Sequence, residues 1–147
     1  MTVESDAQKY FEDHFNCAQS VFAPFAQRYG MDLETALKIA TPFGGGMGHA
    51  SQVCGAVSGG LMAIGLAKGI LTYDRELKYA CYNMAKEFQS RFLELHGEIT
   101  CPGLLGFDIG DPEELEQVRE QNLFHTLCPK FIADAAKLAE AIITSRS

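Results

Sequence analysis

Five cysteines are the residues of this chain best suited to carry chemistry, because a thiolate ligates soft metals and exchanges with disulfides. They are Cys17, Cys54, Cys81, Cys101 and Cys128. With Cys81 set aside, the other four lie 37, 47 and 27 positions apart, and the sequence contains no CxxC motif. Zinc ribbons and thioredoxin-like sites need such a local pair. A shared site would therefore have to be assembled by the fold from distant segments.

Four of these cysteines fall at the starts of predicted helices. They are Cys17, Cys54, Cys101 and Cys128. Asn16 and Gln19 form a capping box around Cys17. A helix predicted from about Ser51 places Cys54 in its first turn. Cys101 and Cys128 each precede a proline, which suits a first helical turn. The positive end of a helix stabilises thiolate, which predicts lowered thiol pKa values. We predict one redox or metal site from these four thiols, against the alternative that each is a small buried hydrophobic residue.

Cys81 differs from the other four, since it lies inside a long helix predicted from Asp74 to Gly97. It belongs to an apolar stripe with a spacing of three or four residues. The stripe contains Leu77, Cys81, Met84, Phe88, Phe92 and Leu95. This position predicts that Cys81 is buried among apolar side chains and takes no part in the site.

Capping residues, prolines and glycines divide the chain into helices. Helix starts are predicted at Ser5 with Gln8, Asn16, Asp32 (for residues 33–40), about Ser51, Asp74, Thr100, Asp111 and Cys128. No alternating apolar pattern predicts a strand. The sequence therefore predicts an all-α fold, a compact bundle of about six or seven helices that forms a single domain over residues 1–147.

Glycines are concentrated in the middle of the chain. The run at 44–48 lacks the Lys-Ser/Thr ending of a phosphate-binding P-loop and predicts a loop that passes close to a packed helix or a cofactor. Gly55 and Gly59 lie one turn apart in the following helix, where they would let another backbone approach closely. We expect Gly55 and Gly59 to belong to the cofactor-binding surface.

Histidines accompany the cysteines in sequence. His49 lies near Cys54, and His125 lies three residues before Cys128. Either could be a substitute ligand or a hydrogen-bond donor to a sulfur, although surface or capping positions are the simpler explanation. His14 is a weaker candidate, and His96 suits the negative end of a helix.

Composition and charge restrict the partners. The chain is 47% hydrophobic and 21% charged, with a net charge of -7, so we expect a globular protein that binds neither nucleic acid nor anionic membranes. The acidic residues 1–13 do not resemble a signal peptide, and glycines break the apolar stretch 53–70, so we expect a cytoplasmic protein. Permanent disulfides are not expected there. The expected partner is another, unidentified redox protein, and a homo-oligomer is possible.

A family resemblance begins at residues 54–59, whose sequence CGAVSG resembles the CGAxxG element of the C_GCAxxG_C_C family of redox-active proteins. Residues 16–19 (NCAQ) resemble the upstream segment of the family, and residues 43–46 resemble its glycine-rich segment. Cys101 and Cys128 fall where its two later cysteines are expected. The resemblance covers nearly the whole chain and implies redox activity with four functional cysteines, without Cys81.

The family is similar to part of split-Soret cytochrome c, in which an iron–sulfur site is associated with the related region. The resemblance therefore implies an iron–sulfur cluster or another transition metal as the cofactor. The chain has no CxxCH motif, so haem is not expected.

Three functions remain open from the sequence. The first is a metal-binding redox protein for electron transfer. The second is a thiol-disulfide protein, in which closing Cys17 to Cys54 would stabilise the fold by roughly 4 kcal/mol. The third is a non-catalytic helical module with structural zinc. The sequence leaves open whether the protein is an enzyme.

Overall fold

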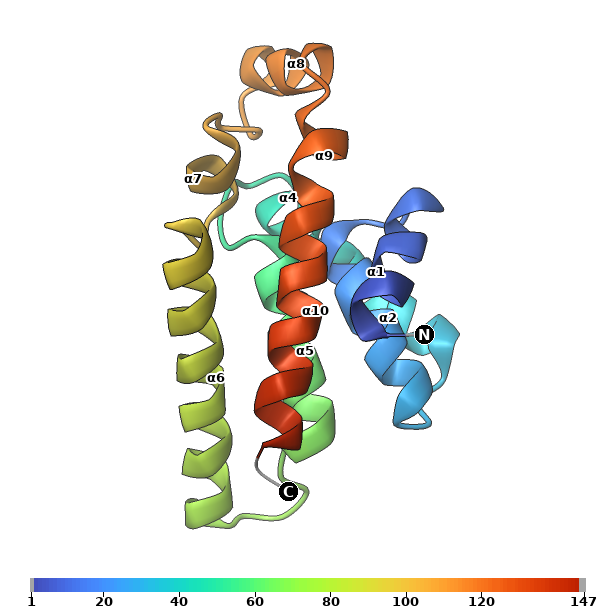
Figure 1. Ribbon diagram of the computed structural model, residues 1–147, viewed down its shortest axis with the longest axis vertical. Coiled ribbons are helices and arrows are strands. Elements are labelled where there is room, and N and C mark those ends of the chain that lie inside the picture. Colours follow the sequence, from blue (N-terminus) through green and yellow to red (C-terminus); the bar gives the residue numbers. More distant parts are fainter. Residues whose placement is uncertain (1, 146–147) are drawn as a thin grey trace.

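The computed structural model describes residues 2–145, and within them the chain forms α-helices joined by short loops, with no β-strand (Figure 1). Seven helices have eight or more residues: α1 (Val3–Glu12), α2 (Cys17–Arg28), α3 (Leu33–Ala40), α5 (Gly55–Lys68), α6 (Arg75–His96), α8 (Pro112–Glu120) and α10 (Cys128–Thr144). Four are shorter: η1 (Thr41–Phe43), α4 (Gly44–Met47), α7 (Cys101–Leu105) and α9 (Leu123–Thr126). The all-α prediction is confirmed. The predicted domain ends, residues 1 and 147, lie outside the described residues.

Side-chain caps fix most helix starts where the sequence predicts them. Asn16, Asp32, Asp74, Thr100 and Asp111 each accept a hydrogen bond from a backbone N–H of the first turn. Such caps satisfy N–H groups that have no partner within the helix. These five predictions are confirmed.

Two helix starts were predicted wrongly. The first helix begins at Val3, because Thr2 is its cap and Ser5 is the N3 member of the capping box, instead of the cap itself. The helix expected from about Ser51 begins at Gly55, with Cys54 as its N-cap. Residues up to 51 form a left-handed loop, and Val53 pairs with Thr100 in an isolated antiparallel bridge. The backbone before Gly55 therefore adopts loop and bridge conformations and cannot be helical.

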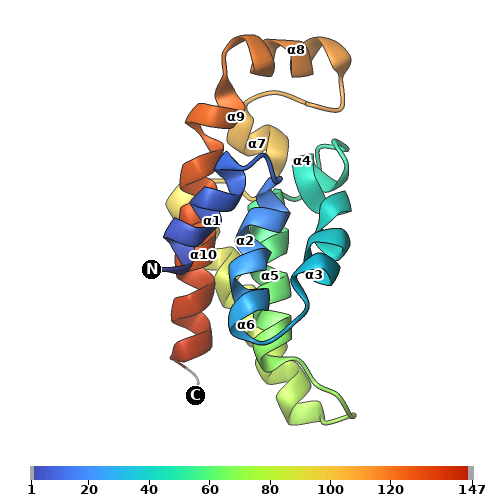
Figure 2. The same cartoon turned by 90° about the vertical axis from the view of Figure 1, so that its right-hand side faces the viewer.

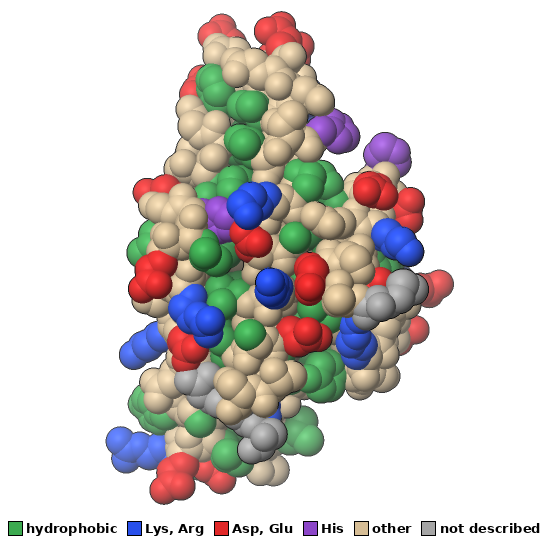
Figure 3. Space-filling view, in the orientation of Figure 1, with side chains coloured by type: hydrophobic (Ala, Val, Ile, Leu, Met, Phe, Trp, Pro, Cys, Tyr) green, Lys and Arg blue, Asp and Glu red, His purple; other side chains and the backbone are tan. Residues whose placement is uncertain are grey.

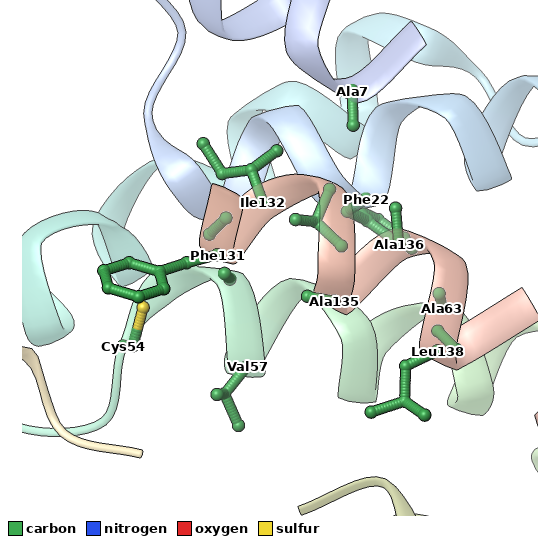
Figure 4. Packing of buried hydrophobic residues seen from close by; sticks show 14 of the residues in the cluster. Ala7, Phe22, Cys54, Val57, Ala63, Phe131, Ile132, Ala135, Ala136 and Leu138 are labelled. Atoms are coloured by element: carbon green, nitrogen blue, oxygen red, sulfur yellow. The ribbon is translucent and has the colours of Figure 1, made fainter. Parts of the chain in front are cut away.

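Helix α5 is the centre of the bundle. It packs against α2, α6 and α10, and α1 covers α2 and α10 from outside (Figures 1 and 2). Figure 4 shows the interface of α10 with its neighbours. Ile132, Ala135 and Ala136 of α10 are buried there, near α2, which carries Phe22, and α5, which carries Ala63. The small side chains of Ala135 and Ala136 allow the helix axes to approach closely. A single buried cluster extends from Val3 to Ile143.

The apolar stripe of α6 is only partly buried. Met84, Phe88 and Phe92 are buried, whereas Leu77 and Leu95 are 57% and 60% exposed. Cys81 is partly buried against the core, so its predicted burial is only partial. The main packing partners of α6 are α5 and α10, and its last residue, His96, still contacts Phe131 and Asp134 of α10.

Acidic and basic side chains are interspersed on the face shown in Figure 3. Among the described residues, no helix is both long enough and apolar enough to cross a lipid bilayer.

The contact between α2 and α5 predicts opposite effects for two glycine substitutions in α5. A Cβ at Gly59 would lie 2.8 Å from the Ala18 carbonyl oxygen and 3.0 Å from the Val21 Cβ, whereas a Cβ at Gly65 would meet nothing within 4 Å. We expect Gly59→Ala to lower the free energy of unfolding by about 1–3 kcal/mol. Gly65→Ala should raise it by about 0.5–1 kcal/mol. Urea unfolding followed by circular dichroism measures both, and equal effects would contradict the proposed close packing.

Candidate functional site

The structure places four cysteine side chains on the wall of one cavity of about 270 Å³. They are Cys17, Cys54, Cys101 and Cys128. All are reduced, and the last three are buried. Each stands at a helix start, as the caps and prolines predicted: three are the first residues of α2, α7 and α10, and Cys54 caps α5. The fold therefore brings together thiols from four separate segments.

A short backbone pairing holds Cys54 and Cys101 in a fixed relation. Val53 and Thr100 form the antiparallel bridge. On either side of it, the Cys54 N–H donates to the Ile99 carbonyl at 2.8 Å, and the Cys101 N–H donates to the Gln52 carbonyl at 2.9 Å. Cys54 and Cys101 consequently lie next to the bridge, at the points where α5 and α7 begin.

Cys17 is positioned by the polar side chains that cap α2. Asn16 Nδ2 donates to the Thr41 carbonyl, and Gln19 Nε2 donates to Thr41 Oγ1, both at 2.9 Å. A Cβ at Gly55 would lie 3.1 Å from the Cys17 Cβ, so the absence of a side chain at Gly55 lets the start of α5 lie against Cys17.

The two glycines expected at the cofactor surface have different surroundings. Gly55 lines the cavity, whereas Gly59 lies one turn further along α5, against Ala18 of α2, and is not among the lining residues. The structural role of Gly59 is helix packing.

Cys17 and Cys128 form a hydrogen-bonded pair. The Cys17 thiol donates to the Cys128 sulfur, and this bond, together with burial, raises the pKa of Cys17 well above its usual value. The same bond lowers the pKa of Cys128, against the opposing effect of burial. Cys128 is therefore the sulfur of the pair that loses its proton first.

Burial raises the pKa of the other two thiols. Desolvation is the largest cause for both, and it raises the pKa of Cys54 to about 11 and that of Cys101 to about 12. The N–H groups of Ala56 and Val57 at the start of α5 oppose the rise at Cys54 without cancelling it. The predicted lowering of thiol pKa values at helix starts is thus wrong for Cys17, Cys54 and Cys101, because desolvation and neighbouring sulfurs outweigh the helix ends.

Three histidines also line the cavity: His14, His49 and His125. All three are exposed, so they lie at its opening. His96 lies elsewhere, with its Nε2 atom 3.1 Å from Asp134 Oδ2 and its ring against Phe92 and Phe131. Cys81 does not line the cavity either.

Aromatic walls of the cavity are a feature that the sequence interpretation missed. Phe11, Phe15, Phe124 and Phe131 line it, and the sulfur of Cys54 points toward the ring of Phe131 (Figure 4). Phe131 follows Cys128 by three residues, so both lie on the same face of α10, and this helical spacing was a usable signal. Phe124 gave no such signal, because its segment reaches the site through tertiary packing.

The described side chains do not form a ready-made metal site. Among the side chains of residues 2–145, no three His, Cys, Asp or Glu groups are placed to hold a metal ion. The four cysteines share the wall of the cavity.

Comparison with known proteins places the chain in a family. The family described as "Putative redox-active protein (C_GCAxxG_C_C)" matches residues 15–142. The chain belongs to the C_GCAxxG_C_C family. The match includes the four cavity cysteines, and it shows a redox-active class without naming a cofactor. Neither a curated protein nor a solved structure matches the chain.

The raised thiol pKa values predict a loss of stability at alkaline pH in the reduced, metal-free protein. Folded Cys54 and Cys101 keep protons that the unfolded chain releases above pH 9.0, the ordinary thiol value. Their contribution is complete below pH 9 and is lost as the pH rises toward 11, by about 1.4 kcal/mol per pH unit for each thiol. Urea unfolding at pH 8, 9 and 10 measures this slope. Cys54→Ala should have a shallower slope, and identical slopes would contradict the assignment.

Proposed function

We propose that this protein transfers electrons through an iron–sulfur cluster, or another transition metal, held by the thiolates of Cys17, Cys54, Cys101 and Cys128. One observation supports the proposal above the others: four free thiols from four separate helix starts line the same cavity. Cysteine is a common core residue, but independent burial does not require four of five cysteines to share one wall. The redox class of the family agrees with such a site.

The donor set fits a cluster. Two-iron and four-iron clusters are held by four cysteine thiolates, which is the number and type of donor that line the cavity. A single tetrahedral zinc ion is also held by four thiolates, each about 2.3 Å from the metal, so metal analysis has to distinguish zinc from a cluster. The N-termini of α2, α5 and α10 add partial positive charge beside an anionic group.

The protein residues would supply ligands, rigidity and exclusion of water. When bound, the cluster supplies a one-electron couple. The bridge between Val53 and Thr100 holds two ligands in a fixed relation, so little reorganisation accompanies a change in charge. Phe124 and Phe131 cover the thiols with apolar surface, which limits solvent access and so influences the redox potential.

Purification without air tests the proposal. We expect iron and acid-labile sulfide in the wild-type protein, with visible absorbance. Replacing any one of the four cavity cysteines by serine should remove most of the metal, because a hydroxyl is a poor ligand for soft metals. Cys81→Ser is the matched control and should keep the full metal content in the folded fraction, since Cys81 is outside the cavity.

Wild-type protein without transition metal under these conditions would contradict the proposal. One zinc per chain without a redox signal would instead identify a structural zinc module.

A thiol-disulfide function is the second candidate, and the hydrogen bond between Cys17 and Cys128 favours it. The lowered pKa makes Cys128 the nucleophile. Its thiolate would attack the disulfide of an oxidised partner, and Cys17 would then resolve the mixed disulfide. One S–S bond forms in this protein as the partner's breaks, and two electrons pass to the partner, which becomes a dithiol.

Mild oxidation of the metal-free protein tests this second candidate. We expect a disulfide between Cys17 and Cys128, found by mass spectrometry of the digested protein. Cys128→Ser should abolish it, whereas Cys81→Ser should leave its yield unchanged. Random or intermolecular pairing would exclude this function.

A further inference from the structure

The loop before α5 has an unusual left-handed backbone. Positive φ angles occur at Gly45, Gly46, Met47, Gly48, His49 and Ser51. A residue other than glycine pays a steric cost of about 1–2 kcal/mol in this conformation, which persists only where surrounding contacts enforce it. Here the Gln52 N–H donates to the Gly46 carbonyl at 2.9 Å, and Ser51 Oγ donates to Asp108 Oδ1 at 2.5 Å. The loop is therefore held in place at the cavity.

The imidazole of His49 is fixed from two sides. The ring lies so close to Gly45 that a Cβ there would collide with its Cδ2 atom. On another side the ring stacks on Phe124, with the centroids 6.5 Å apart and the planes inclined by 18°. Gly45, His49 and Phe124 all line the cysteine cavity. Backbone conformation, the bare glycine and the aromatic ring together specify where this imidazole stands.

The other two histidines at the opening are not fixed in this way. His14 has a positive φ angle because it ends α1, and its N–H donates to the Phe11 carbonyl at 3.1 Å. His125 lies within α9, and its ring is only tilted against that of Phe11, with centroids 6.4 Å apart. At each described glycine, neither ring is among the three atoms nearest to an added Cβ, whereas the His49 ring is at Gly45. The cost of a left-handed backbone at His14 is thus explained by helix termination, whereas at His49 it serves to place the ring.

We propose that His49 is a fifth functional side chain of the four-cysteine site, and that its imidazole N–H donates a hydrogen bond to a sulfur of the group that the cysteines hold. This inference rests on the proposed cluster-binding function. Four thiolates complete the ligand set, so the imidazole is not needed as a ligand. Reduction adds negative charge to a cluster, and an N–H donor stabilises the more negative state. His49 therefore raises the reduction potential.

The test is the midpoint potential of the anaerobically purified, metal-loaded protein. His49→Phe keeps an aromatic ring that can lie against Gly45 and stack on Phe124, but it has no N–H donor. His49→Asn tolerates the left-handed backbone and is too short to replace the imidazole. We expect both variants to keep wild-type iron and sulfide contents and to have lower potentials. His14→Phe is the matched control at the same opening and should keep the wild-type potential.

The outcomes separate this inference from the proposed function. Metal-loaded His49→Phe and His49→Asn with the wild-type potential would overturn the role of His49 alone. An equal shift in His14→Phe would also overturn it, because the effect would then follow from any change at the opening. Wild-type protein that binds no metal would overturn the proposed function and this inference with it.

Discussion

Backbone contact between α2 and α5 is the constraint on which the site depends. At Gly55 and Gly59 the two helices meet without an intervening side chain, so that a Cβ at either position would lie about 3 Å from atoms of Cys17, Ala18 or Val21. This approach brings the start of α2, with Cys17, beside the start of α5, with Cys54. The bridge at Val53 then adds Cys101, and the packing of α10 on α5 adds Cys128. Glycine in α5 has a cost in helix propensity, and this local cost is offset by the assembly of four distant segments.

Burial gives the site a second property, since thiolates are expensive where water is excluded. The raised pKa values of Cys54 and Cys101 mean that these thiols hold their protons at neutral pH in the metal-free protein. A metal would have to displace them, so its uptake would release protons and become more favourable as the pH rises. The Cys17–Cys128 pair is the exception, because one thiol there stabilises its neighbour's thiolate. The same pair can explain either entry of a metal through Cys128 or disulfide chemistry, which is why both functions follow from one geometry.

Local chemistry made most of the fold predictable. Caps such as Asn16 and Asp74, and the prolines after Cys101 and Cys128, act within one helical turn. The helix starts that they fix can therefore be predicted from neighbouring residues in the sequence. The exposure of Leu77 and the placement of Phe124 depend on which helices lie alongside, and no local pattern carries that information. The thiol pKa values failed for a related reason: the helix end is a local feature, whereas desolvation depends on everything that covers the sulfur. The positions of the cavity cysteines were thus more predictable than their protonation.

The proposed function requires the four cavity cysteines to act as one unit. An anaerobic crystal structure with anomalous data at the iron edge tests it most directly, because it locates both the metal and its ligands. We expect one metal group bonded to the sulfurs of Cys17, Cys54, Cys101 and Cys128, with Cys81 a free thiol in α6. Iron bound elsewhere, or four unbonded thiols around an empty cavity in the protein as purified, would contradict it.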